Sequence, residues 1–155
     1  MKSFNWLLVL SVLSCIGCSS PVHEDGRGCA FVSDSIQYRV EFMSAGCVRI
    51  LSFPEGDTLV TKRLVGDSEK PAFKDYKWED TGQKLLFRTC ELSVVFAKAD
   101  AAFIFQETST GKLLLKEKGD RKARNFKRSV AGGEQCLEVT QRFVSTEDEA
   151  ISGLR

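Results

Sequence analysis

The chain has 155 residues, of which 43% are apolar, and its 22 basic and 21 acidic side chains leave a formal net charge of +1. This length allows one domain with a hydrophobic core and is too short for two. A net charge near zero gives no sign of a polyanionic partner such as nucleic acid.

The N-terminal residues have the order of an export signal. Lys2 precedes an apolar run, Phe4–Leu13, and small residues with two cysteines follow. The run is shorter than the about 20 residues that a membrane-spanning helix needs, and the arrangement is typical of a signal peptide. Because Gly17-Cys18 fits the cleavage site of a bacterial lipoprotein, we expect residues 1–18 to be a lipoprotein-type signal with Cys18 as the lipid anchor.

Two alternatives to the Cys18 anchor remain open. Ser14-Cys15 competes as the lipidation site, and a plain secretory signal would leave both cysteines incidental. An acylated Cys18 would carry enough lipid for stable attachment to a membrane. We therefore expect an exported, membrane-anchored lipoprotein in the periplasm or on the outer-membrane surface.

A polar segment separates the signal from the rest of the chain. Residues 19–28, SSPVHEDGRG, contain two glycines and a proline and show no apolar period. This composition is typical of a flexible tether. The globular domain is expected over residues 29–155.

Four cysteines lie in the expected domain: Cys29, Cys47, Cys90 and Cys136. In an exported protein they allow three disulfide pairings, and free thiols packed as small apolar residues are the alternative. The single histidine, His23, is on the tether, and the Cys-x-x-Cys spacing occurs only within the signal. The sequence therefore predicts no metal site and no cofactor.

Apolar and polar residues alternate in several short segments, which is the period expected of half-buried strands. Ile36–Phe42 alternates clearly, and Cys47–Phe53 ends at a PEGD turn. Leu85–Lys98 reads as one strand with one apolar face, which comprises Leu86, Cys90, Leu92, Val94 and Phe96. The later segments with strand character are Ala102–Gln106, Lys112–Lys116 and Cys136–Phe143.

No segment has the pattern of an amphipathic helix of ten or more residues, and turn signals separate the strands. This combination predicts an all-β fold, an antiparallel β-sandwich. The basic stretch Asp120–Arg128 is expected to be a solvated loop rather than a polyanion-binding patch, since Phe126 is its only aromatic residue.

Four motifs follow one another in an informative order. They are a V-R-I strand that runs to a proline, the strand TCELSVVF, the hairpin FIFQETSTGKLLL and an acidic stretch that leads to Ser-Gly-Leu. The matching residues are Val48, Arg49, Ile50 and Pro54; Thr89, Leu92 and Val94; Phe103, Phe105, Gly111, Lys112, Leu113 and Leu114; and Glu147, Asp148, Glu149, Gly153 and Leu154. Over most of residues 30–154, the chain resembles the N-terminal β-sandwich of glycoside hydrolase family 31, which includes α-glucosidases and α-xylosidases. That domain is similar to the galactose mutarotase sandwich.

The resemblance implies a role without catalytic residues. In family 31 the two catalytic aspartates belong to a (β/α)₈ barrel, which this chain does not contain. We therefore expect no catalytic residue here, and whether the chain acts as an enzyme stays open. The expected function is that of a non-catalytic N-terminal domain in an exported α-glycosidase of carbohydrate metabolism, where it supports the barrel and borders the sugar-binding cleft.

Two residues depart from the family pattern. Ser152 occupies the place of an aromatic residue, and Arg155 occupies the place of a glycine. We therefore expect a chain truncated before the catalytic barrel, with its sandwich incomplete at the C-terminal end. A mutarotase-like epimerase would need a histidine and a glutamate for proton transfer, and His23 on the tether does not fit that role. The acidic run Glu147–Glu149 is expected to be a solvated turn, because adjacent residues of an extended segment point to opposite faces.

A stand-alone, lipid-anchored glycan-binding surface protein is the alternative function. Sugar sites need aromatic faces with polar groups beside them, and the segment FKDYKWED supplies Tyr76 and Trp78 as possible sugar-facing aromatics. The competing interpretation is that both are core residues of a strand. Under either function the expected partners are a carbohydrate and a membrane, with no nucleic acid.

Overall fold

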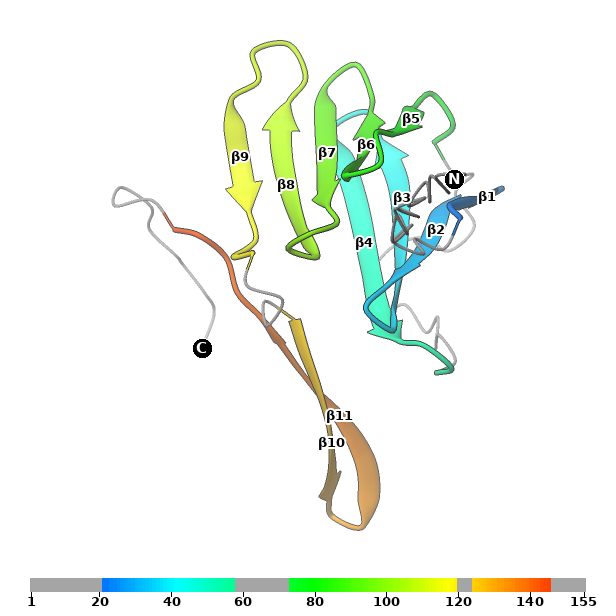
Figure 1. The fold of residues 1–155 in the computed structure, drawn as a ribbon, viewed down its shortest axis with the longest axis vertical. Helices are drawn as coiled ribbons and strands as arrows, with labels where there is room; N and C mark the ends of the chain where they lie inside the picture. Colours follow the sequence, from blue (N-terminus) through cyan, green and yellow to red (C-terminus); the bar gives the residue numbers. More distant parts are fainter. Residues whose placement is uncertain (1–20, 58–72, 120–123, 146–155) are drawn as a thin grey trace, which may run out of the picture.

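A computed structural model describes residues 21–57, 73–119 and 124–145 of the chain (Figure 1). The described residues form an all-β fold whose paired strands are antiparallel. The predicted fold class is thereby confirmed. The expected signal with Cys18, and the acidic run with the Ser-Gly-Leu motif, lie outside the described residues.

The first sheet contains the N-terminal strands in the order β1-β2-β3-β4. These are β1 (His23–Asp25), β2 (Gly28–Ser33), β3 (Ile36–Ser44) and β4 (Cys47–Pro54). Within it, Arg49 of the V-R-I motif lies directly opposite Glu41, and its Nε donates to the buried carboxylate at 2.8 Å. A buried charge is tolerated only when it is paired, so this motif arginine has a structural role on β4.

The structure differs from the expected tether in residues 21–28. Strand β1 pairs with β2, and the Asp25 carboxylate accepts hydrogen bonds from the backbone N–H groups of Arg27 and Gly28 at 2.8 and 3.2 Å. The same carboxylate forms an ion pair with Arg39 on β3. A residue distant in the sequence, Arg39, thus helps to hold this segment in place. The polar composition of the segment itself gives no sign of this contact.

The second sheet contains five strands in sequence order. They are β5 (Lys77–Asp80), β6 (Lys84–Arg88), β7 (Leu92–Ala97), β8 (Ala102–Glu107) and β9 (Leu113–Lys116). The single strand predicted over Leu85–Lys98 is wrong, because residues 89–91 form a turn between β6 and β7. The Thr89 hydroxyl accepts the Leu92 N–H at 2.9 Å and donates to the Ala45 carbonyl at 2.5 Å. Cys90 is consequently exposed on this turn rather than buried in a strand.

A two-stranded hairpin of β10 (Arg124–Ala131) and β11 (Glu134–Gln141) follows the second sheet. Gly132 and Gly133 both have positive φ, 61° and 86°, as a two-residue hairpin turn of type I′ requires. The expected loop over the basic stretch is therefore wrong for residues 124–128, which belong to β10. The positive charges in this stretch do not prevent β10 from pairing with β11, because the cationic side chains project from either face of the strand into water.

The two sheets pack face to face around an aromatic core. The Phe96 ring lies 4.8 Å from that of Phe31, 5.0 Å from that of Tyr38 and 4.9 Å from that of Phe103, measured between centroids. These contacts join β2 and β3 to β7 and β8. Buried aromatic rings contribute large apolar areas and favourable tilted packing, so this cluster holds the sandwich together.

Cys29, Cys47 and Cys90 carry free thiols. Cys29 is fully buried on β2 and packs as a small apolar residue. The two exposed thiols lie at the start of β4 and on the β6–β7 turn.

Candidate functional site

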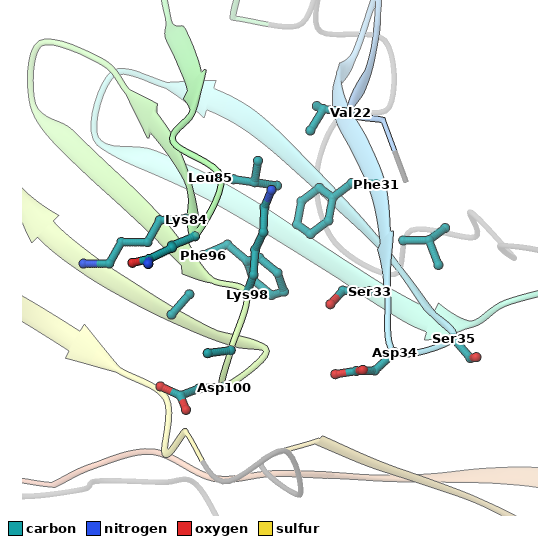
Figure 2. A pocket seen from close by; sticks show the side chains of 15 residues that line it. Val22, Phe31, Ser33, Asp34, Ser35, Lys84, Leu85, Phe96, Lys98 and Asp100 are labelled. Atoms are coloured by element: carbon teal, nitrogen blue, oxygen red, sulfur yellow. The ribbon is translucent and has the colours of Figure 1, made fainter. Parts of the chain in front are cut away.

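A cleft of about 780 Å³ opens at one end of the sandwich, between the two sheets (Figure 2). Its floor is apolar and consists of Val22, Phe31, Leu85 and Phe96. Its rim is polar and includes Ser33, Asp34, Ser35, Gln83, Lys84, Lys98 and Asp100. A concave apolar surface with a few polar groups at its edge is the usual form of a small-molecule site.

Two tight turns place the acidic residues of the rim. Asp34 and Ser35 form the turn between β2 and β3, with φ values of 51° and 60°, and Ala101 has a φ of 49° beside the β7–β8 turn. These three are the non-glycine residues with positive φ within the described ranges. An L-residue in this conformation costs roughly 1–2 kcal/mol, and such strain often lies at functional sites. Figure 2 shows Asp34 and Asp100 on facing sides of the cleft.

The charges on the rim fall into two groups. The Lys98 ammonium lies 2.7 and 2.9 Å from the two carboxylate oxygens of Asp80, and this hydrogen bonding holds the pKa of Asp80 below its usual value. The side chains of Asp34, Lys84 and Asp100, by contrast, have no hydrogen-bond or ion-pair partner in the part of the chain that the structure describes. They are available to a polar ligand. Within the described ranges no group of three or more potential metal ligands comes together.

The two aromatic residues predicted to face sugar lie elsewhere, on and beside β5. Both are half-buried and pack against the core, and the Tyr76 ring stacks on Phe42 at 5.2 Å. The Tyr76 hydroxyl donates to one carboxylate oxygen of Glu24 at 2.9 Å, and the Trp78 indole N–H donates to the other at 3.1 Å. Burial raises the pKa of Tyr76. Their role as sugar-facing aromatics stays a prediction, and this geometry also suits residues that fix β5 to the core.

Sequence reasoning missed Glu24, because it lies in the segment expected to be a tether. No local signal could have identified it, since its partners are more than 50 residues away in the chain. It also missed Glu117, which is fully buried directly after β9. One Glu117 oxygen accepts the Phe103 backbone N–H at 2.8 Å, and the other accepts the Gln141 amide.

A second hollow lies along the open side of the sandwich. It has a volume of about 380 Å³ and an apolar lining that includes Val48, Ile50, Leu92, Phe105, Leu115 and Phe143. The hollow lies between β4 and β9, which are the last strands of their sheets on this side. We call it the side groove.

No protein-family model matches the sequence, and no curated protein matches it. Among solved structures, the chain is similar to the glycoside hydrolase family 31 α-xylosidase from Xanthomonas citri, with a TM-score of 0.63 and 24% sequence identity. The match covers 82% of this chain and 14% of the α-xylosidase chain. This likeness shows the fold of the chain. Most of the chain corresponds to a small part of a much longer polypeptide. The part of the chain that the structure describes contains no helix long and apolar enough to span a membrane.

Proposed function

We propose that the chain is the non-catalytic N-terminal sandwich, of the galactose mutarotase-like type, of an exported α-glycosidase that acts in carbohydrate metabolism. The observation that supports this proposal best is the fold shared with a family 31 α-xylosidase. The match covers 82% of this chain but only 14% of that one. In this proposal the (β/α)₈ barrel and its two aspartates belong to another part of the enzyme. A retaining glycosidase needs two carboxyl groups about 5–5.5 Å apart, and the barrel supplies them.

The sandwich supports the barrel and borders the sugar-binding cleft in the intact enzyme. The cleft at the end of the sandwich supports this role, because Asp34, Lys84 and Asp100 hold polar groups beside an apolar floor. Such groups can orient the hydroxyls of a sugar that reaches them from an adjoining site.

Two measurements test the function. Translation of all reading frames beyond the codon for Arg155 is expected to reveal a barrel with two strand-end aspartates. The chain by itself is expected not to hydrolyse 4-nitrophenyl α-xyloside or α-glucoside, with the Xanthomonas citri α-xylosidase as the positive control. Hydrolysis by the chain alone, or the absence of any barrel-coding frame, would contradict the proposal.

The location of the protein is tested through the two signal cysteines. Lipidation at Cys18 predicts that Cys18→Ser releases the protein from the membrane fraction, whereas Cys15→Ser leaves it attached. The matched pair distinguishes the two sites, because both variants change one thiol within the same short segment. Release by Cys15→Ser alone would make Cys15 the anchor, and attachment of both variants would contradict Cys18 as the sole attachment to the membrane.

A stand-alone, lipid-anchored glycan-binding protein is the second candidate function. The observation in its favour is the cleft itself, with three rim side chains that have no described partner. Titration of xylo- and gluco-oligosaccharides, followed by NMR, tests it directly. If Asp100→Asn weakens binding, the sugar binds in the cleft. If only Trp78→Ala weakens binding, the sugar binds at the aromatic pair.

A further inference from the structure

Two carboxylates on the rim of the end cleft have no counter-ion. Asp34 and Asp100 lie on facing sides of the cleft (Figure 2), and their side chains have no partner within the described ranges. An ionised carboxylate only accepts hydrogen bonds, so a ligand must bring donors to satisfy these two groups. The hydroxyls of a neutral sugar are such donors, whereas a ligand carboxylate offers none.

A residue outside the cleft holds one of its cations. The Lys98 ammonium lies 2.7 and 2.9 Å from the two carboxylate oxygens of Asp80, which is not among the residues that line the cleft. Only 17% of the Lys98 side chain is exposed, and a mostly buried cation needs a paired anion. Lys98 is therefore not available to a ligand while Asp80 remains its partner.

The register of the second sheet explains how this ion pair reaches the cleft. Asp80 on β5 is opposite Leu85 on β6, and Leu85 is opposite Phe96 on β7. Residues opposite one another share a face of the sheet, so Asp80 is on the face that carries the apolar floor. Lys98 lies two positions after Phe96, and Figure 2 shows its side chain extending toward Leu85. The pair therefore lies at the edge of the floor.

The charge that remains available to a ligand is mainly negative. Asp34 and Asp100 contribute two negative charges, unpaired Lys84 contributes one positive charge, and the Asp80–Lys98 pair is neutral as a unit. Both carboxylates border one cleft of about 780 Å³, so an anion inside it lies within about one Debye length of each, which is about 10 Å at about 0.1 M salt. An anionic ligand is therefore repelled from two sides.

We propose that the cleft selects neutral saccharides over acidic ones, and that Asp80 sets this selectivity by keeping the Lys98 ammonium paired. Asp34 and Asp100 accept hydrogen bonds from the hydroxyls of a neutral sugar and repel the carboxylate of a uronic acid. Asp80 is a positioning residue, because it acts through Lys98. The proposal rests on the proposed role of the cleft in binding sugar, and it adds the class of sugar.

Two ligands that differ in charge test this selectivity. One is maltotriose, and the other is maltotriose whose non-reducing-end glucose is oxidised to glucuronic acid, so that a carboxylate replaces a hydroxymethyl group. Titration of the full chain followed by NMR gives the affinity for each ligand, and the amide signals of Ser35 and Gly82 report binding in the cleft. The readout is the ratio of the two affinities, which a purely structural role of Asp80 would leave unchanged.

Three variants separate the effect of Lys98 from that of net charge. Asp80→Asn removes the partner's charge but keeps the oxygen that accepts the Gly82 N–H at 2.8 Å. Glu79→Gln is the matched control, since it removes the same charge one residue away on β5, opposite Leu86 and on the other face. The double variant Asp80→Asn/Lys98→Met also removes the released cation and keeps an apolar side chain in its place.

The wild type is expected to bind the neutral ligand at least about threefold more tightly than the acidic one. Asp80→Asn should shift the ratio at least about tenfold toward the acidic ligand, whose carboxylate replaces that of Asp80 on Lys98. Glu79→Gln and the double variant should stay within about twofold of the wild type, because a charge on the far face is screened.

Three results would overturn the selectivity. They are equal or tighter binding of the acidic ligand by the wild type, equal shifts in Asp80→Asn and Glu79→Gln, and a double variant that shifts as far as Asp80→Asn. A different result separates the failure of the underlying function. If neither ligand moves the amide signals of the cleft in the wild type, the cleft is not a sugar site, and its proposed role fails together with its selectivity.

Discussion

Glu117 shows how one residue can join parts of this fold. Its side chain is fully buried, although it stands between two exposed lysines in the sequence. A buried carboxylate is tolerated only if its oxygens are hydrogen-bonded. Here they accept the N–H of Phe103 on β8 and the amide of Gln141 on β11. The residue therefore joins the end of β11 to the second sheet.

Glu117→Ala is expected to lower the free energy of unfolding by about 1–3 kcal/mol, because it leaves the buried Phe103 N–H without its acceptor. Glu117→Gln keeps one acceptor oxygen and should cost less. Urea unfolding followed by tryptophan fluorescence measures both effects. Lys116→Ala, at the exposed neighbouring position, is the control. If the losses in Glu117→Ala and Lys116→Ala are equal, the proposed tie is wrong.

The buried thiol of Cys29 should make the free energy of unfolding depend on pH. Burial raises the pKa of its thiol from 9.0 to about 11. Between these values the unfolded thiol loses its proton while the folded one keeps it, so the free energy of unfolding falls as pH rises from about 9 to about 11. Tyr76, whose pKa burial also raises, adds to this fall above pH 10.0.

The window between about pH 8 and 10 isolates the contribution of the thiol. Urea unfolding across this window should show a declining stability for the wild type, with a slope of at most about 1.4 kcal/mol per pH unit. Cys29→Ala should flatten the decline, whatever its effect on stability at neutral pH. The same slope in both proteins would show that Cys29 does not cause it.

Among the structural elements, the β2–β3 turn has an unusual sequence for its backbone conformation. Type I′ turns favour Asn-Gly, because both central residues have positive φ, yet Asp34-Ser35 occupies this turn. Ser35→Gly is expected to raise the free energy of unfolding by about 0.5 kcal/mol, since relief of strain exceeds the added freedom of the unfolded chain.

Ser33→Gly in β2 is the matched control for this turn. A glycine within a strand should lower stability by roughly 0.5–1 kcal/mol. Urea unfolding of both variants should therefore give changes of opposite sign. A loss of stability in Ser35→Gly would mean that the Ser35 side chain has a stabilising role that exceeds its strain.

The elements that the sequence predicts correctly are those with a regular period of two. Alternation locates β3 and β4 closely, and turn signals locate β8 and β9. The errors arise where long-range pairing decides the structure. Strand β1 depends on the ion pair between Asp25 and Arg39, and the basic residues of β10 depend on pairing with β11.

The predicted site residues reflect the same limit. The sequence identifies Tyr76 and Trp78 as notable aromatics, but only the fold brings Glu24 to their polar atoms. The cleft at the end of the sandwich combines two turns and two strand ends that lie far apart in the chain. No sequence pattern marks such a cleft, because its residues share neither a period nor a motif.

At the scale of the whole molecule, stability is unevenly distributed. The two sheets share the aromatic core around Phe96, whereas the β10–β11 hairpin is held to them by Glu117, by the pairing of Phe143 and by the exposed ion pair between Arg128 and Asp57. Regions with few buried apolar contacts open locally at low free energy. The β10–β11 hairpin should therefore be the least protected of the described hairpins.

Hydrogen exchange followed by mass spectrometry measures this difference. Amides of β10 and β11 are expected to exchange at least about 100-fold faster than those of β3 and β7, because opening the hairpin leaves the core intact. Equal protection of the β10–β11 hairpin and the two sheets would show that the hairpin opens only together with the core, and the uneven distribution of stability would be wrong.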